Sequence, residues 1–201
     1  MKQAFRRGDT LIEVLFAITV FSLIVVTSLS LMNQGTAASQ RSMEITLVRQ
    51  QIDSQAETLR FLHDSYVSAY QSGQAPSTGP AGEFTKIINQ VKTTGNASAS
   101  TFGSVKCGTP PSGSFVLDTH AAKLVTNSAI FKYPDTYAQT IYDATGNMTS
   151  SNGIWIEGVR SASTGANAGY IDFHIRGCWD TPGLNVSMNL GTIVRLYEPR
   201  G

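Results

Sequence analysis

The sequence predicts an α+β fold in which one long N-terminal helix packs on a C-terminal domain built around an antiparallel β-sheet. Three observations support this prediction. A stretch without any charged residue runs from Val14 to Met32, and an apolar stripe with helical spacing follows it. Sixteen of the eighteen glycines then lie after residue 72, in a part that is also rich in Ser, Thr and Asn. Such a composition is typical of β structure with many loops.

The length and charge of the chain narrow its possible classes. It has 201 residues, 14% of them charged, and a formal net charge of +1. A chain of this length forms one domain, or one domain with an appendage. The balanced charge argues against a basic nucleic-acid-binding protein, and we expect no direct binding to nucleic acid. The composition also excludes a collagen-like chain, a coiled coil throughout and a multi-span membrane protein.

The apolar segment at residues 11–32 has the length of a membrane span. Its charge-free part, from Val14 to Met32, spans about 28 Å as a helix, close to the roughly 30 Å of a bilayer core. Lys2, Arg6 and Arg7 precede it. By the positive-inside rule the N-terminus stays in the cytoplasm and the rest of the chain is exported.

Three interpretations of this segment compete, and Glu13 separates them. A secretory signal peptide would be cleaved near residues 36–38, but its apolar region normally has only 7–15 residues. A plain signal anchor leaves Glu13 unexplained, because a carboxylate inside a bilayer costs several kcal/mol unless it reaches the surface or finds a partner. The third interpretation explains both the acid and the short basic leader.

Residues 6–14 read Arg-Arg-Gly-Asp-Thr-Leu-Ile-Glu-Val, with Gly8 third and Glu13 eighth in this run. This run resembles the class III signal of type IV prepilins and type II secretion pseudopilins. In that family a short basic leader ends in Gly and a prepilin peptidase cuts after it, which here places the cut between Gly8 and Asp9. Glu13 then becomes the fifth residue of the mature chain, where the family carries the glutamate that acts in assembly. The first mature residue is often an N-methylated Phe in the family, whereas this chain has Asp9 as its possible methylation site.

The resemblance also implies a fold, a function and partners. The fold is pilin-like, and the protein is a minor pilin-like structural subunit of a type IV pilus or a related filament that serves adhesion, twitching motility, DNA uptake or secretion. The implied partners are the prepilin peptidase, other pilin subunits through the N-terminal helix, an assembly ATPase and a platform membrane protein. The chain would span the inner membrane once before assembly and lie in an extracellular pilus or on the cell surface afterwards.

The helical pattern continues beyond the apolar segment, so we predict one helix over residues 9–72 after a leader at 1–8. On one side an apolar stripe recurs at three- and four-residue spacing. Its members are Ile45, Val48, Ile52, Ala56, Leu59, Leu62 and Tyr66. Charged residues fill the other side, as in a helix packed on a domain. Gly73 and Pro76 end the pattern.

Residues 73–113 form a loop-rich connecting region, in which the sequence predicts one short helix at Glu83–Lys92. Residues 114–201 form the β-rich domain. The predicted strands are Ser114–Asp118, Ala122–Thr126, Gly153–Val159, Tyr170–Arg176 and Gly191–Glu198. The segments Ala144–Asn152 and Ser161–Ala168 are rich in turn-forming residues and are predicted to be linkers.

The sequence contains no motif for catalysis, for a metal or for a cofactor. It lacks the P-loop, the HExxH zinc motif, the GxSxG nucleophile motif and Cys-x-x-Cys. We therefore expect no enzyme activity, no catalytic residue, no metal site and no cofactor. The alternative function is a membrane-anchored or secreted binding module or hydrolase that uses the N-terminal segment only as a signal or anchor.

The two cysteines, Cys107 and Cys178, both lie in the part expected to be exported, where oxidation is permitted. Pilin-like proteins often close the loop-rich C-terminal half with one disulfide, so the resemblance implies a Cys107–Cys178 pair. Closing a loop of about 70 residues stabilises a chain by roughly 4 kcal/mol in the chain-entropy model. Two separate buried thiols are the alternative.

Overall fold

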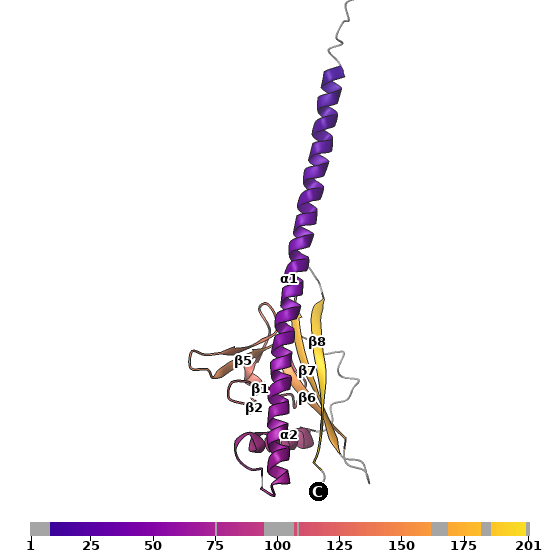
Figure 1. The fold of residues 1–201 in the computed structure, drawn as a ribbon. Helices are drawn as coiled ribbons and strands as arrows, with labels where there is room; N and C mark the ends of the chain where they lie inside the picture. The colour runs from indigo at the N-terminus through magenta and orange to yellow at the C-terminus, as the bar shows by residue number, and fades with distance from the viewer. Residues whose placement is uncertain are drawn as a thin grey trace, which may run out of the picture. The chain divides into compact units, whose positions relative to one another are not determined.

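A computed structural model describes residues 9–74, 76–94, 107, 109–161, 169–181 and 186–199, and Figure 1 shows its fold. The predicted leader with Gly8, and most of the predicted linker Ser161–Ala168, lie outside the described residues. The elements in chain order are α1 (Asp9–Gln71), α2 (Gly79–Thr94), β1 (Val116–Asp118), β2 (Lys123–Val125), a 3₁₀ turn η2 (Ser128–Ile130), β3 (Phe131–Lys132), β4 (Gln139–Tyr142), β5 (Met148–Asn152), β6 (Ile154–Ser161), β7 (Tyr170–Asp180) and β8 (Ser187–Tyr197).

The chain divides into two compact units, Met1–Met43 and Glu44–Gly201. The described part of the first unit is the N-terminal part of α1, residues 9–43. The second unit contains the remainder of α1, together with α2 and all the strands. A long N-terminal apolar helix and a C-terminal domain with an antiparallel sheet confirm the predicted α+β layout.

The main sheet of the second unit has the strand order β6-β7-β8, and both pairings are antiparallel. Its central strand β7 pairs residue by residue with β8 over eleven positions, from Tyr170 opposite Tyr197 to Asp180 opposite Ser187. Along β7 the side chains of Ile171, Phe173 and Ile175 are buried and alternate with more exposed neighbours. This alternation is expected of an antiparallel sheet with one face on the core and one toward solvent.

Two smaller β structures complete the domain. Strands β1 and β2 form an antiparallel hairpin, and an antiparallel bridge between Phe115 and Ile156 joins the start of this hairpin to β6. The other is a three-stranded sheet with the order β3-β5-β4, in which the short strand β3 runs parallel to β5. This two-residue parallel pairing is a local exception to the predicted antiparallel arrangement.

The C-terminal part of α1 forms one wall of the core (Figure 1). Of the predicted stripe, five side chains from Val48 to Leu62 are buried, and Ile45 and Tyr66 pack against them half-buried. Gly177 on β7 permits this packing, because a Cβ there would lie 2.7 Å from Cγ1 of Val48. The predicted helical stripe is therefore the core face of α1.

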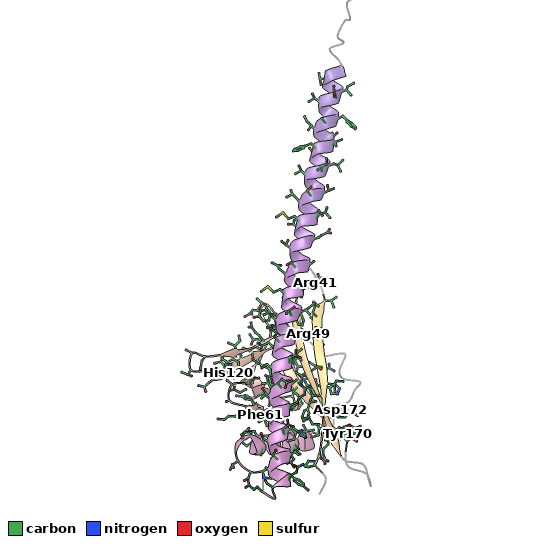
Figure 2. The ribbon with its side chains drawn as sticks, in the orientation of Figure 1. Arg41, Arg49, Phe61, His120, Tyr170 and Asp172 are labelled. Carbon is green, nitrogen blue, oxygen red and sulfur yellow. A yellow bond between two sulfur atoms is a disulfide. The ribbon has the colours of Figure 1, made fainter. Side chains whose placement is uncertain are left out.

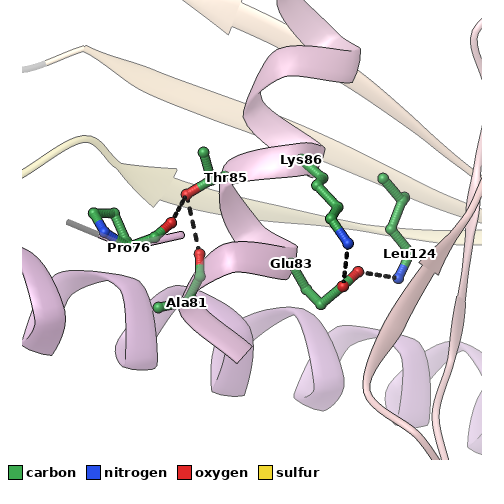
Figure 3. A network of polar contacts seen from close by, with 6 residues as sticks. All are labelled: Pro76, Ala81, Glu83, Thr85, Lys86 and Leu124. Carbon is green, nitrogen blue, oxygen red and sulfur yellow. Dashed lines mark hydrogen bonds and ion pairs between the residues drawn. The ribbon is translucent and has the colours of Figure 1, made fainter. Parts of the chain in front are cut away.

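Helix α2 covers another part of the core through Phe84, Ile87 and Val91. Polar contacts fix its first turns, as Figure 3 shows. Glu83 accepts a hydrogen bond from Lys86 Nζ at 2.6 Å and another from the backbone N–H of Leu124 at 3.1 Å. Because Leu124 lies on β2, this single carboxylate joins α2 to the β1–β2 hairpin.

Some predicted boundaries are wrong. Helix α2 begins four residues before and ends two residues after the predicted Glu83–Lys92. The predicted linker Ala144–Asn152 contains strand β5, and no strand was predicted at β4. The sequence of β5 is Met-Thr-Ser-Ser-Asn, so its pattern lacks the apolar alternation of a strand, although Ser150, Ser151 and Asn152 are all buried. Pairing with the neighbouring strands therefore makes this segment a strand, although its own residues have a low preference for β structure.

Candidate functional site

The candidate site for processing and assembly lies at the start of α1. The helix begins at Asp9, the residue that the predicted cut would make the first of the mature chain. Gly8 lies outside the described residues. Glu13 follows four residues after Asp9, about one helical turn further on, so both positions lie on the same face of the helix. Glu13 therefore lies near the N-terminal end of α1, where the helix dipole favours negative charge.

Glu13 lies on a surface that is mostly apolar and carries no other charge. Every residue from Leu11 to Thr36 is exposed, and large aliphatic and aromatic side chains point outward all around this part of α1. This helix is long and apolar enough to cross a membrane, and it is the one such helix in the described part of the chain. A helix that is apolar on all sides is stable only when lipid or other apolar helices surround it.

The hydroxyl groups of this segment are satisfied within the helix. Thr19 donates to the carbonyl of Phe16 at 2.8 Å, and Ser22 donates to that of Ile18 at 2.8 Å. Thr27 donates in the same way to the preceding turn. Glu13 differs, because no residue in the described part of the chain forms a hydrogen bond or ion pair with its carboxylate. In an apolar environment such a carboxylate costs several kcal/mol unless it reaches the membrane surface or gains a partner.

No family model, no curated protein and no solved structure matches this chain.

The cysteines form the predicted disulfide. Cys107 and Cys178 are bonded, with their Cα atoms 5.1 Å apart and a sequence separation of 71. Both are buried with Trp155 in a small cluster, against which Phe131 packs. The alternative of two separate thiols is therefore wrong. The bond joins the segment that enters β1 to the central strand β7.

Sequence analysis missed two glutamines that face the core from α1. The amide of Gln55 donates to the carbonyl of Leu117 at 2.7 Å and accepts from the N–H of the same residue at 2.9 Å. Gln51 accepts from the backbone N–H and the hydroxyl of Thr140. These side chains satisfy backbone groups of β1 and β4 that would otherwise be buried without partners. Their position beside the apolar stripe was the signal that could have revealed this role.

Glu44 is a third missed residue, since the charged side of the helix was expected to face solvent. Its Oε2 atom accepts hydrogen bonds from Trp179 Nε1 at 3.0 Å and from Thr181 Oγ1 at 2.8 Å. Both donors are buried at the end of β7. Glu44 thus ties the first turn of α1 in the second unit to the central strand of the sheet.

Glu157 on β6 is a buried carboxylate with only one hydrogen bond. Trp155 Nε1 donates to its Oε1 atom at 2.7 Å, while Oε2 has no hydrogen-bond partner among the described residues. Burial raises the pKa of Glu157, and the bond from Trp155 and the charge of Arg176 oppose this only in part. The folded domain therefore favours the protonated form of Glu157 more than an unfolded chain does.

The residues with metal-binding potential stay apart. In the described ranges, no three His, Cys, Asp or Glu side chains come close enough to hold a metal ion. His63 contacts the carbonyl of Tyr197 at 2.9 Å, and His120 stacks on Tyr142. These contacts account for two histidines through packing and hydrogen bonding.

Proposed function

We propose that this protein is a minor pilin-like structural subunit of a type IV pilus or a related filament. One observation carries the proposal. The helix begins at Asp9, the residue after Gly8; its surface over residues 11–36 is exposed and largely apolar, and Glu13, at the fifth position, is the one charged residue of that stretch. A signal peptide or a simple anchor has no use for that carboxylate, whereas an assembling helix does.

In this proposal Glu13 pairs with the N-terminal amine that cleavage creates on a neighbouring subunit. Moving a lone carboxylate into a bundle of apolar helices is costly, but a cationic amine at hydrogen-bond distance compensates both charges. The pair forms only at one axial offset between two helices. The ion pair therefore fixes the axial position of an incoming subunit relative to the subunits already assembled.

The second unit supports this role as a stable domain for the exported side. Its core and the glutamine contacts attach the C-terminal part of α1 to the strands, and the disulfide joins the segment before β1 to β7. Force applied along α1 is then carried into the β domain through many contacts. The proposed partners remain the prepilin peptidase, other pilin subunits, an assembly ATPase and a platform protein of the membrane.

The test is the substitution Glu13→Val in cells that assemble the filament. We expect normal cleavage and normal membrane insertion, because both depend on the leader and the apolar segment, and Val is less costly in lipid than a carboxylate. Incorporation into sheared filaments should fall by about tenfold or more, since a buried amine would lose its counter-charge.

The matched control is Thr19→Val, which removes a polar group of the same helix whose hydroxyl is already bonded to Phe16. This variant should assemble like the wild type. Immunoblots of membrane and sheared-filament fractions measure both effects. Wild-type incorporation of Glu13→Val would contradict the pairing mechanism.

A further inference from the structure

The solvent-facing side of the main sheet carries an ordered row of polar and aromatic side chains. Because Ile171, Phe173 and Ile175 point into the core, the alternate residues of β7 point to the opposite side, which we call the outer face. The β7–β8 register places four residue pairs along this face. They are Arg176 with Gly191, His174 with Ile193, Asp172 with Arg195, and Tyr170 with Tyr197. Successive pairs are about 7 Å apart, so the row is about 20 Å long.

One side of the outer face is closed and the other is open. On β6, Trp155 and Glu157 are 1% and 3% exposed. On β8, Ile193 and Tyr197 are 60% and 55% exposed. Further along β6, Val159 and Ser161 are half-buried, so the most accessible part of the face is the strip formed by β7 and β8.

At one end of the strip a planar charged pair is held rigidly beside aromatic rings. Arg195 donates two hydrogen bonds to Asp172, each 2.7 Å long, and its guanidinium lies 4.1 Å from the centre of the Tyr170 ring. These bonds hold the pKa of Asp172 below its ordinary value, so the pair is charged at neutral pH. Tyr197 meets Tyr170 edge to face. Figure 2 shows Tyr170 and Asp172 next to each other on the sheet.

At the other end the strip is hollowed. Gly191 leaves a gap in the side-chain layer, and a groove of about 320 Å³ lies there. A Cβ at this position would lie 2.9 Å from the carbonyl oxygen of Ile175, so the strand spacing favours glycine. His174, Arg176 and Asn189 are among the residues that line the groove. Burial and the charge of Arg176 lower the pKa of His174, so at neutral pH its ring offers one donor and one acceptor.

We propose that this strip of the outer face binds an uncharged oligosaccharide. The C–H faces of sugar rings pack on aromatic side chains such as Tyr197, while their hydroxyl groups bond to fixed polar groups such as the Asp172–Arg195 pair and Asn189. Groups of opposite charge lie near the cations of the strip: Arg195 bonds to Asp172, and the charge of Arg176 acts on the carboxylate of Glu157 on the neighbouring strand, while the ring of His174 is uncharged at neutral pH. A strip without unmatched charge favours a neutral ligand. Its length suits several linked sugar units.

The experiment uses the full-length protein in a zwitterionic detergent, because a sugar-based detergent would compete. The probes are linear tetrasaccharides of β-1,4-linked glucose, β-1,4-linked N-acetylglucosamine and α-1,4-linked glucose, printed on an array beside sulfated versions of the same chains. We expect binding to at least one neutral tetrasaccharide, confirmed by calorimetry. The corresponding disaccharide should bind at least tenfold more weakly, because it reaches only half of the strip.

Substitutions on the outer face test whether the sugar binds there. Tyr197→Ala and Asn189→Leu should each weaken binding by about tenfold. Tyr70→Ala is the matched control, since Tyr70 is 40% exposed on α1, and it should bind like the wild type. Circular dichroism and thermal unfolding verify that each variant is folded.

Three results would overturn the proposal: no binding to any of the neutral tetrasaccharides, binding only to sulfated chains with loss in high salt, or wild-type binding by both Tyr197→Ala and Asn189→Leu. Sugar binding does not require assembly into a filament. Uncleaved protein carrying Gly8→Ala should therefore bind the sugar as well as the wild type does. Failure of this inference and failure of the proposed assembly role are therefore distinguishable.

Discussion

The two parts of α1 meet opposite surroundings, although both belong to one helix of 63 residues. In residues 11–36 every side chain is exposed, and apolar groups cover all sides. In residues 44–71 a narrow apolar stripe is buried, and polar side chains flank it. The first part depends on an apolar environment from outside the chain, while the domain supplies that environment for the second.

The comparison also shows two ways of satisfying polar groups. In the first part, hydroxyl side chains bond back to the helix itself, which suits a segment without other protein around it. In the second part, Thr58 and Ser65 also bond back to the helix, and in addition Gln51 and Gln55 reach across to groups of the strands. Glu13 follows neither pattern. This exception is the reason for assigning it a partner in another subunit.

The largest effect should come from truncating matched leucines in the two parts. Leu59→Ala removes a fully buried side chain and should lower the free energy of unfolding of the β domain by about 2–5 kcal/mol. Leu23→Ala lies on the exposed apolar surface and should leave the stability of that domain unchanged. Chemical denaturation, followed by tryptophan fluorescence from Trp155 and Trp179, measures both. If both variants lowered the free energy of unfolding equally, the two parts of α1 would not differ in their contribution to the stability of the domain.

A smaller effect should follow from replacing one glutamine. Gln55→Leu keeps the size of the side chain but leaves the N–H and carbonyl of Leu117 buried without their partners. We expect a loss of about 1–3 kcal/mol in the free energy of unfolding. The control is Gln50→Leu, at an exposed position of the same helix, which should change stability by less than about 0.5 kcal/mol. Unchanged stability of Gln55→Leu would show that the contact with β1 contributes nothing.

The smallest effect concerns Glu157 and depends on pH. The pKa of Glu157 is raised in the folded state. The protonated side chain therefore contributes its full stabilisation at pH values below the ordinary pKa of 4.5, and this stabilisation is lost as the pH rises through the pKa of the folded state. Glu157→Gln is always neutral and should remove this loss, so the variant should gain on the order of 1 kcal/mol over the wild type at pH 7 and less at pH 4. Unfolding curves at both pH values measure it. A gain that is larger at pH 4 would contradict the assignment.

Sequence patterns predicted the helical parts of this fold better than the strands. The stripe from Val48 to Leu62 has a strict period, so its buried face followed directly. Strand β5 has no such pattern, because its buried residues are Ser150, Ser151 and Asn152, which pair with β3 and β4. The position of Gln55 beside the apolar stripe indicates a side chain near the core, but no local pattern identifies the partners of Gln55 or Glu44. Their roles depend on which strands lie opposite them, and only the tertiary structure supplies that.

For the candidate site, the sequence supplied the residues and the structure supplied their surroundings. Glu13 was identified by its place after Gly8, and the exposed apolar surface around it adds a physical reason for a partner. The disulfide required the structure to choose between one bond and two thiols. The strip on β7 and β8 had no sequence signal, since it exists only through the register of two strands distant from any motif.

The most direct test of the central claim is the N-terminus of the mature protein. Intact-mass and N-terminal sequence analysis should be made on protein isolated from the membrane and from the cell surface. We expect a chain that begins at Asp9, with or without one added methyl group, and that retains the entire apolar part of α1. A chain that begins at Met1, or one that begins near Ser39 after loss of the apolar segment, would contradict it.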